Sequence, residues 1–549
     1  MAPPSDTPVN STTPAPPRIS GPLSLLTRFG ERQPLLVLLG IMMLGLGARY
    51  PLLFDRDIWL DEVYVHVMVA GPLNELGDRV RSEDRFPPLF HILCRAVTAV
   101  SDDPKAIRLI SLVAGLGTIP LGWILGRQLH GSTTGWALAV FVALAPPYVF
   151  YSREARPFAL GLFLLFAFFT ALVSVYRKPT RQAIGIASTV TAAAVLTQYA
   201  NIVVIAVTLG LAVIGTVATQ LRWTRRLSGL LVVFGTWLAV TVYVYLMFAA
   251  PQIAIRGTGT GQFDRNFYDI RDYSSTGQFA VSQTAELLNY GILGGNLGPK
   301  WLLLTSLCVV TTLVIAVATN RTRLGLFGMV TGLAVVLVFL LLAGIGKHPY
   351  GGIRHCLVVT PLVLATMAGG LGVGTSRLAR IVSECFFVLI VGLMAYGVVR
   401  VIPGENRYEF SQILPALADR TTPSDVLYVT GRYDSVAVGH LVSGNLTTSF
   451  RVLHDAMKAN GDAVDLPSYP LRVYAWDLTD APKQPDSRRD LPVLFTPTGR
   501  VWVTDTFRSE PPPRPVRQGF AFQIVDEIKA PGCRATCWQS VANNERDRK

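Results

Sequence analysis

The sequence predicts a mostly α-helical, multi-pass membrane protein with a small α/β domain at its C-terminal end. Half of the 549 residues are apolar, only 15% are charged, and long apolar runs recur as far as residue 400. Soluble proteins carry about 25% charged residues. A net charge of +13 would suggest nucleic-acid binding in a soluble protein, but basic residues between apolar runs are typical of cytoplasmic loops. We therefore expect a membrane environment and no nucleic-acid partner.

Eleven apolar segments are candidate membrane spans, since a span needs about 20 mostly apolar residues. They cover residues 33–54, 106–126, 133–150, 157–176, 183–198, 201–219, 228–250, 300–318, 324–345, 356–374 and 381–400. The weakest is 183–198, which is short and rich in Ala and Thr. If it formed one broken helix with 201–219, every later loop would lie on the opposite side of the membrane.

Lysine and arginine positions decide between these alternatives, because cytoplasmic loops are enriched in both. With the N-terminus inside, every predicted inner segment contains at least one of them, and most contain two or three. This holds only if 183–198 and 201–219 are separate spans. The sequence therefore predicts about eleven spans in the cytoplasmic (inner) membrane, with the N-terminus inside and the C-terminal domain outside.

The composition changes at both ends of the apolar region. The first 22 residues are rich in Pro, Ser and Thr, so we expect residues 1–32 to form a disordered cytoplasmic tail. Residues 33–400 form the predicted transmembrane domain. Residues 401–549 are charged and contain β-like runs at 426–430, 471–475, 500–504 and 521–525, which indicate an outer α/β domain. Cys533 and Cys537 in this domain could form a disulfide or remain two unpaired thiols.

Five unusual polar stretches lie at span ends or in short loops, and the predicted topology places all five on the outer side. They are Asp55–Asp57 with Asp61–Glu62, Asp84–Leu89, Tyr151–Pro157, Thr197–Tyr199 and Lys347–His355. Ionisable groups near membrane depth are costly, so their presence predicts a functional site. The polar connection 251–298 is also long, which is typical of a lid or binding segment.

Asp61 and Glu62 open the stretch 63–69, which we expect to form an interfacial helix. One interpretation is helix-start chemistry, because carboxylates are stabilised in the first helical turn. The other is a carboxylate that takes a proton from a hydroxyl group, kept ionised by a nearby arginine. The pair Pro87–Pro88 should end one short helix and begin another at Leu89, so residues 63–100 predict two interfacial helices.

Arg153 and Arg156 lie three residues apart at an outer span boundary, as if on one helical face. One interpretation is snorkelling of the guanidinium groups to the membrane interface. Guanidinium groups also bind phosphate oxygens, so these two residues and the cationic stretch 347–355 could together hold a lipid-linked phosphate.

Four strings occur in a fixed order: IWLDEVYV, DRFPPLFHIL, AIRLISLVAGLGTIPLGWILGRQLHG and YSREARPFAL. This order resembles the membrane glycosyltransferases of the GT-C superfamily, specifically the PMT-like, family 39 type related to the lipid A aminoarabinose transferases. The similarity covers residues 50–200 and extends to 351–361. It implies a GT-C fold and transfer of a sugar, with inversion, from a polyprenyl-phosphate donor to a hydroxyl of an envelope lipid, polysaccharide or protein.

Carried over to this sequence, the resemblance implies that Asp61 is the general base and Glu62 its partner. The residues expected to bind the donor phosphate are Arg153, Arg156, Lys347 and Arg354. Those expected to contact substrate are Asp84, Tyr151, Glu154, Tyr199, His348 and His355.

The sequence departs from the family pattern at two positions, where Phe86 and Gln198 replace histidines. A metal or proton role for those histidines therefore cannot be carried over. His91, His348 and His355 could compensate, although a lone histidine is more often structural. Asp55 and Asp57 could ligate Mg²⁺ or Mn²⁺. The sequence does not decide whether a metal ion is bound.

Two other functions remain possible on the residues alone. A transporter or flippase could bind the same lipid-linked phosphate without chemistry, although no internal repeat supports it. A sensor or scaffold could bind a wall polymer through the outer domain.

Overall fold

The computed structural model describes residues 21–219, 224–256, 266–269, 272–295, 298–319, 322–371 and 377–401, together with short stretches between 413 and 541. The first half contains α1 (Pro22–Arg32), α2 (Pro34–Arg49), α3 (Leu60–Ala70), η1 (Leu73–Glu75), α4 (Leu76–Glu83), α5 (Leu89–Thr98), η2 (Pro104–Ile107), α6 (Arg108–Leu129), α7 (Ser132–Leu144), α8 (Pro146–Tyr151), α9 (Phe158–Arg177), α10 (Arg181–Val195) and α11 (Tyr199–Thr219). There follow α12 (Arg225–Val244), η3 (Tyr245–Ala249), α13 (Ala250–Arg256), α14 (Thr276–Leu293), α15 (Pro299–Thr319), α16 (Arg323–Gly344), η5 (Arg354–Val359), α17 (Thr360–Leu371) and α18 (Arg377–Val401).

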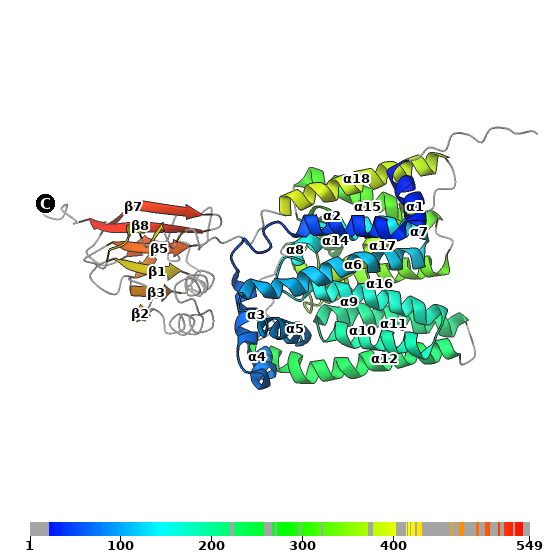
Figure 1. The fold of residues 1–549 in the computed structure, drawn as a ribbon, viewed down its shortest axis with the longest axis horizontal. Coiled ribbons are helices and arrows are strands. Elements are labelled where there is room, and N and C mark those ends of the chain that lie inside the picture. Colours follow the sequence, from blue (N-terminus) through cyan, green and yellow to red (C-terminus); the bar gives the residue numbers. More distant parts are fainter. Residues whose placement is uncertain are drawn as a thin grey trace, which may run out of the picture.

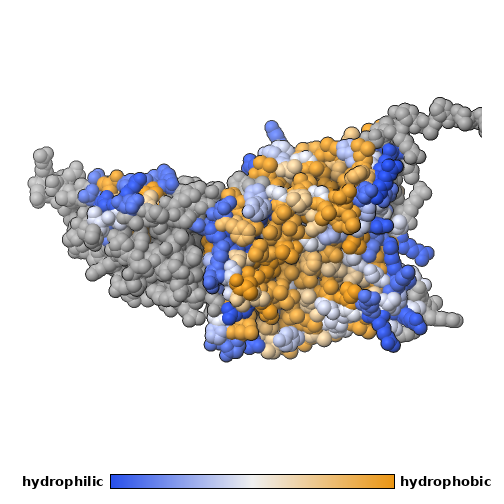
Figure 2. Space-filling view, in the orientation of Figure 1, coloured by the Kyte–Doolittle hydropathy of each residue, from blue (hydrophilic) through white to orange (hydrophobic). Residues whose placement is uncertain are grey.

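All eleven predicted segments contain a helix, which confirms the mostly α-helical class. Among the described residues, eight helical segments are long and apolar enough to cross a membrane, and α2 and α7 are shorter apolar helices. The segments 183–198 and 201–219 are separate helices, α10 and α11, as predicted. Figure 2 shows an apolar surface between two hydrophilic rims, the arrangement that a lipid bilayer requires.

The first connection contains three short α-helices, α3, α4 and α5, where two were predicted. Pro87 and Pro88 separate α4 from α5, and α5 begins at Leu89, as the proline rule predicts. Helices α3, α4 and α5 lie together at one end of the helical body, and α1 lies toward the other end (Figure 1). The polar connection 251–298 differs from a plain loop, because it contains α13 and the 18-residue helix α14.

The predicted tail 1–32 differs from the structure at its end. Residues 22–32 form α1, whose first turn is capped by Glu384 of α18: the carboxylate accepts hydrogen bonds from Leu23 N and Ser24 N, both at 2.7 Å. No local pattern predicts a cap that comes from a residue 360 positions away in the chain. Residues 1–20 lie outside the described part of the chain.

The C-terminal region contains a mixed six-stranded sheet of order β2-β3-β1-β5-β8-β7 and a two-stranded sheet of β4 with β6. Strand β1 pairs in parallel with β3 and β5, and β8 pairs antiparallel with β5 and β7. The strands are β1 (Val426–Thr430), β2 (Ala463–Val464), β3 (Arg472–Trp476), β4 (Asp490–Pro492), β5 (Val501–Asp505), β6 (Arg514–Val516), β7 (Ala521–Ala530) and β8 (Cys533–Val541). The four predicted runs correspond to β1, β3, β5 and β7.

Strand β8 resolves the alternative left open for the two cysteines. Cys533 and Cys537 lie on this one strand, and Cys537 is a buried free thiol. Four residues of extended chain span roughly 13 Å, whereas a disulfide needs Cα atoms within about 7 Å. The Cys533–Cys537 disulfide is therefore absent.

Candidate functional site

Charged side chains from three distant parts of the chain meet at the end of the helical body that carries α3. They come from the start of α3, from the turn 152–157 between α8 and α9, and from η5. The turn is irregular rather than helical, so the expected helical face shared by Arg153 and Arg156 is not formed. Pro157, which precedes the first residue of α9, has no N–H to donate to the carbonyl of Arg153.

Asp61 lies between two arginines. Its Oδ2 accepts a hydrogen bond from Nη1 of Arg354 at 2.8 Å and lies 3.6 Å from Nε of Arg156. The side chain of Asp61 is 18% exposed and that of Arg354 is 29% exposed. The carboxylate is therefore both ion-paired and accessible from outside the protein.

Glu62 has different surroundings, because its carboxylate is completely buried. Oε2 accepts from Nη2 of Arg108 at 2.6 Å, and Oε1 accepts from Nε of Arg108 at 2.8 Å and from the N–H of Ala155 at 2.9 Å. Burial alone would raise the pKa of Glu62, but the charges of Arg108 and Arg56 lower it to about 2. This geometry favours a structural role, in which Glu62 joins α3 to α6 and to the turn.

Arg56 links the second buried acid to the same network. Its guanidinium contacts Glu62 at 3.4 Å, Glu154 at 3.2 Å and the carbonyl of Arg153 at 2.5 Å. Burial raises the pKa of Glu154 to about 7; Arg56 opposes that rise, and the carboxylates of Glu62 and Asp61 add to it. Arg153 is itself 2% exposed.

The stretch 84–89 contributes a buried acid–imidazole pair. Oδ2 of Asp84 lies 2.6 Å from Nε2 of His91, and Oδ1 of Asp84 accepts a hydrogen bond from the backbone N–H of Arg85 at 2.7 Å. Desolvation would raise the pKa of Asp84, but the contact with His91 and the charge of Arg156 lower it. Phe86, which stands at one of the two departures from the family pattern, lies under the guanidinium of Arg156 at 4.9 Å.

The predicted substrate-binding tyrosines are held by groups that the sequence did not single out. Tyr199 donates to Oε1 of Gln252 at 2.8 Å, and the amide of Gln252 donates to the carbonyls of Val80 and Phe86. Tyr151 accepts from the hydroxyl of Tyr290 at 2.9 Å.

The stretch 347–355 is only partly brought to the site. Arg354 reaches Asp61, and the ring of His355 lies 6.1 Å from that of Phe158 and 6.4 Å from that of His348. Nδ1 of His348 lies 2.7 Å from the carbonyl of Pro349. Lys347 is exposed after α16, and the structure does not bring it together with Asp61.

Three buried arginines near the turn have no role assigned from the sequence: Arg56 and Arg108, which hold the acids, and Arg49, whose acceptors are neutral. Arg49, Arg56 and Arg108 are all buried, at 0%, 3% and 0% exposure. Two of them could have been found from the sequence. Arg49 ends an apolar run and Arg108 begins one, and a charged residue at such a position is costly unless it has a role.

The donor atoms near Asp61 do not fit a divalent cation. Within the described ranges there is no group of three or more His, Cys, Asp or Glu side chains that could hold a metal ion. The nearest charged partners of Asp61 are arginines, which repel a cation. Asp55 and Asp57 form no such group either.

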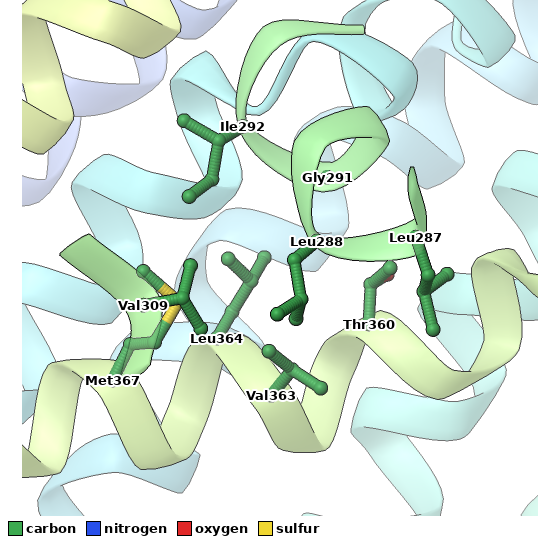
Figure 3. Close-up of a pocket in the computed structure, with 9 residues that line it drawn as sticks. All are labelled: Leu287, Leu288, Gly291, Ile292, Val309, Thr360, Val363, Leu364 and Met367. Carbon is green, nitrogen blue, oxygen red and sulfur yellow. The ribbon is translucent and has the colours of Figure 1, made fainter. Parts of the chain in front are cut away.

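A small cavity of about 10 Å³ lies among α14, α15 and α17. Figure 3 shows its lining, which is Leu287, Leu288, Gly291, Ile292, Val309, Thr360, Val363, Leu364 and Met367. It has room for little more than one water molecule and offers no charged group, so it does not suit a sugar or a phosphate.

The sequence matches no protein-family model and no curated protein. The structure is similar to the Archaeoglobus fulgidus oligosaccharyltransferase solved with Zn and sulfate, at 12% identity and a TM-score of 0.48 over 74% of this chain and 61% of that one. It is similar to the archaeal oligosaccharyltransferase AglB from Archaeoglobus fulgidus in complex with an inhibitory peptide and a dolichol-phosphate, at 13% identity and a TM-score of 0.45 over 76% of this chain and 64% of that one.

It is also similar to ArnT from Cupriavidus metallidurans bound to undecaprenyl phosphate, at 13% identity and a TM-score of 0.48 over 91% of this chain and 96% of that one. The chain spans about three fifths of the archaeal protein's length. Both proteins are GT-C membrane glycosyltransferases, the superfamily that the sequence motifs resemble.

Proposed function

We propose that this protein is an inverting membrane glycosyltransferase. It moves a sugar from a polyprenyl-phosphate-linked donor to a hydroxyl group of an envelope lipid, polysaccharide or protein. The observation that carries this proposal is the accessible carboxylate of Asp61 between the guanidinium groups of Arg354 and Arg156. An attacking hydroxyl needs a base, and a phosphate leaving group needs fixed cations.

In the proposed reaction, the acceptor oxygen forms a bond to the anomeric carbon while the bond from that carbon to the phosphate oxygen breaks. The proton of the hydroxyl goes to Asp61. The electron pair of the broken bond stays on the polyprenyl phosphate, whose added charge is met by Arg354 and Arg156. Arg354 and Arg156 contact the carboxylate of Asp61 in the free protein, so the donor phosphate would compete with this carboxylate for both arginines.

Glu62 takes no part in the proton transfer in this scheme. Its two oxygens are occupied by Arg108, Arg56 and the N–H of Ala155, and its pKa of about 2 makes it a poor base. It holds the turn that carries Arg156 against α3. No step requires a metal ion.

The orientation in the membrane follows from the same proposal. The site lies at the end of the helical body that carries α3 to α5, and α1, with Arg28 and Arg32, lies toward the opposite end (Figure 1). Basic residues favour the cytoplasmic side. We place the N-terminus inside, and the site and the domain 401–549 on the outer face of the cytoplasmic membrane.

The first experiment compares the purified protein with Asp61→Asn on a panel of polyprenyl-phosphate sugars. General-base catalysis contributes about 10²- to 10⁴-fold, so release of polyprenyl phosphate should fall by that factor with little change in melting temperature. The matched control is Asp78→Asn, because Asp78 pairs with Arg81 at 3.0 Å but is 77% exposed. Equal turnover by Asp61→Asn would dismiss Asp61 as the base. Movement of an intact lipid-linked sugar from one leaflet of a vesicle membrane to the other, without bond cleavage, would favour a transporter.

A further inference from the structure

Arg49, the last residue of α2, is a buried cation that the proposed reaction does not use. Its side chain is completely buried. Nη1 donates to the carbonyls of Ala143 at 2.7 Å and Gly45 at 3.0 Å, and Nη2 donates to the carbonyl of Val142 at 3.0 Å. All of these acceptors are neutral. A buried guanidinium without a carboxylate partner is costly, so its presence requires a reason.

The reason begins with the proline pair that ends α7. In a continuing helix, the carbonyls of Val142 and Ala143 would accept from the N–H groups of residues 146 and 147. Both of those residues are proline, and proline has no N–H. Arg49 donates to these same two carbonyls. It therefore supplies the two hydrogen bonds that Pro146 and Pro147 cannot make.

The position also suits a positive charge. Aligned peptide dipoles give the C-terminal end of a helix a partial negative charge, which stabilises a cation there. The guanidinium of Arg49 lies at the C-terminal end of α7 and of α2 itself. The helix ends thus offset part of the cost of burying Arg49.

The contacts of Arg49 continue into the proposed site. Its Nε donates to Oγ of Ser152 at 3.2 Å, and Oγ of Ser152 donates to the carbonyl of Tyr148 in α8. Gly115 of α6 makes room for this contact, since a Cβ there would lie 1.9 Å from Oγ of Ser152. Ser152 is the first residue of the turn that carries Arg153, Glu154 and Arg156.

The turn is therefore held from two sides. On the side of α3, Glu62 accepts from the N–H of Ala155, and Arg56 donates to the carbonyl of Arg153. On the side of α2, Arg49 donates to the carbonyl of Ala143, next to the break between α7 and α8, and to the hydroxyl of Ser152. Ser111 of α6 also donates to the carbonyl of Arg156 at 3.2 Å. Removal of the Arg49 anchor would therefore loosen the start of the turn, at Ser152, and leave the contacts further along in place.

We propose that Arg49 is a positioning residue that acts through Ser152 and α8 to set the place of Arg156 beside Asp61. This inference deepens the proposed function and rests on it. Arg49 touches neither donor nor acceptor. It replaces two missing backbone donors and thereby fixes where the phosphate-binding turn begins.

The first test does not depend on any substrate. Amide hydrogen exchange is measured on the purified full-length protein, on Arg49→Gln and on Ser152→Ala. In Arg49→Gln, we expect exchange in residues 148–156 to become about tenfold or more faster, with α9 and α11 unchanged. The control is Arg79→Gln, because Arg79 is also buried and donates to a carbonyl, that of Pro72, at 2.7 Å. Unchanged exchange in Arg49→Gln would overturn the inference.

The second test measures binding of undecaprenyl phosphate as a probe of the phosphate site. We expect Arg49→Gln to raise its Kd about tenfold, Arg49→Lys to recover part of the loss, and Arg79→Gln to have no effect. Because Arg49 acts through Ser152, the effects of Arg49→Gln and Ser152→Ala should be less than additive. Arg49→Lys and Ser152→Ala keep the test valid if Arg49→Gln fails to fold.

The outcomes separate the inference from the proposed function. If the wild type binds undecaprenyl phosphate and Arg49→Gln and Ser152→Ala bind it equally well, the positioning role is wrong. If the wild type neither binds the probe nor turns over any donor, the proposed function is wrong. If, in addition, hydrogen exchange in the turn were faster in Arg49→Gln, Arg49 would be confirmed as a residue that holds the turn, but its proposed effect on phosphate binding would be overturned.

Discussion

Asp61 and Glu62 are neighbours in the chain, but their carboxylates lie in opposite environments. Asp61 faces outward between Arg354 and Arg156, whereas Glu62 faces inward to Arg108 and Arg56. Successive residues at the start of a helix point about 100° apart, so one can be accessible while the next is buried. At the residue scale, this division separates the chemical role proposed for Asp61 from the structural role of Glu62.

Glu154 predicts a pH dependence of stability. It keeps its proton to about pH 7 in the folded protein, whereas an ordinary glutamate loses it near pH 4.5. The folded state therefore binds more protons than the unfolded state between these values, and stability falls as the pH rises through that window. Glu154→Gln removes this contribution.

The measurement is the melting temperature in detergent from pH 5 to pH 8. We expect the wild type to lose stability relative to Glu154→Gln as the pH rises. Glu75→Gln, at an exposed position in η1, is the control and should follow the wild type. A constant difference between the wild type and Glu154→Gln would show that Glu154 does not titrate in this range.

At the scale of elements, the site depends on how helices end. Pro87 and Pro88 separate α4 from α5, and Pro146 and Pro147 separate α7 from α8. Each break releases carbonyl groups that another part of the chain must satisfy. The carbonyl of Phe86 accepts from Gln252, and those of Val142 and Ala143 accept from Arg49.

Helix α1 gives a prediction at this scale, because its docking rests on Glu384. The carboxylate satisfies two N–H groups of the first turn of α1 and lies at the positive end of that helix. Loss of such a cap costs about 0.5–2 kcal/mol. Glu384→Ala should therefore release α1 from α18, with faster hydrogen exchange in residues 22–32 and more rapid trypsin cleavage after Arg28.

The control for α1 is Glu31→Ala, which removes an acid from the other end of the same helix. It should leave exchange in the first turn unchanged. If Glu384→Ala also leaves it unchanged, packing against α7 rather than the cap holds α1 in place.

At the scale of the whole molecule, the charges are divided between the two ends of the helical body. The acid–arginine cluster lies at one end, and α1 with its basic residues lies toward the other. Apolar surface occupies the space between the hydrophilic rims (Figure 2). In the proposed function, this division would let a lipid-linked donor keep its chain in the bilayer while its phosphate reaches the arginines.

The orientation can be measured with single cysteines on intact cells and a membrane-impermeant maleimide. Asp78→Cys, in α4, should be labelled from outside, and Lys178→Cys, after α9, should be labelled only when the cells are opened. Both positions are exposed in the structure. The reverse pattern would place the site inside and would exclude an outer acceptor.

Residue order and composition are enough to predict the apolar helices, their order and several residues of the candidate site. Hydrophobic length and proline positions act locally, so the eleven helical segments and the start of α5 could be predicted without any knowledge of packing. The acid pair and the arginines could be chosen because charges near membrane depth are costly wherever they lie.

Which of these groups meet depends on how the helices pack against one another. Arg354 is 293 residues from Asp61 in the chain, and its contact with Asp61 depends on how η5 packs against the start of α3. The burial of a side chain is a property of the assembled helices. It makes the environment of Glu62 different from that of Asp61, and it leaves Lys347 exposed and outside the cluster. The same holds for Arg49. It donates hydrogen bonds to two carbonyls of α7, and no sequence pattern around residue 49 predicts these partners.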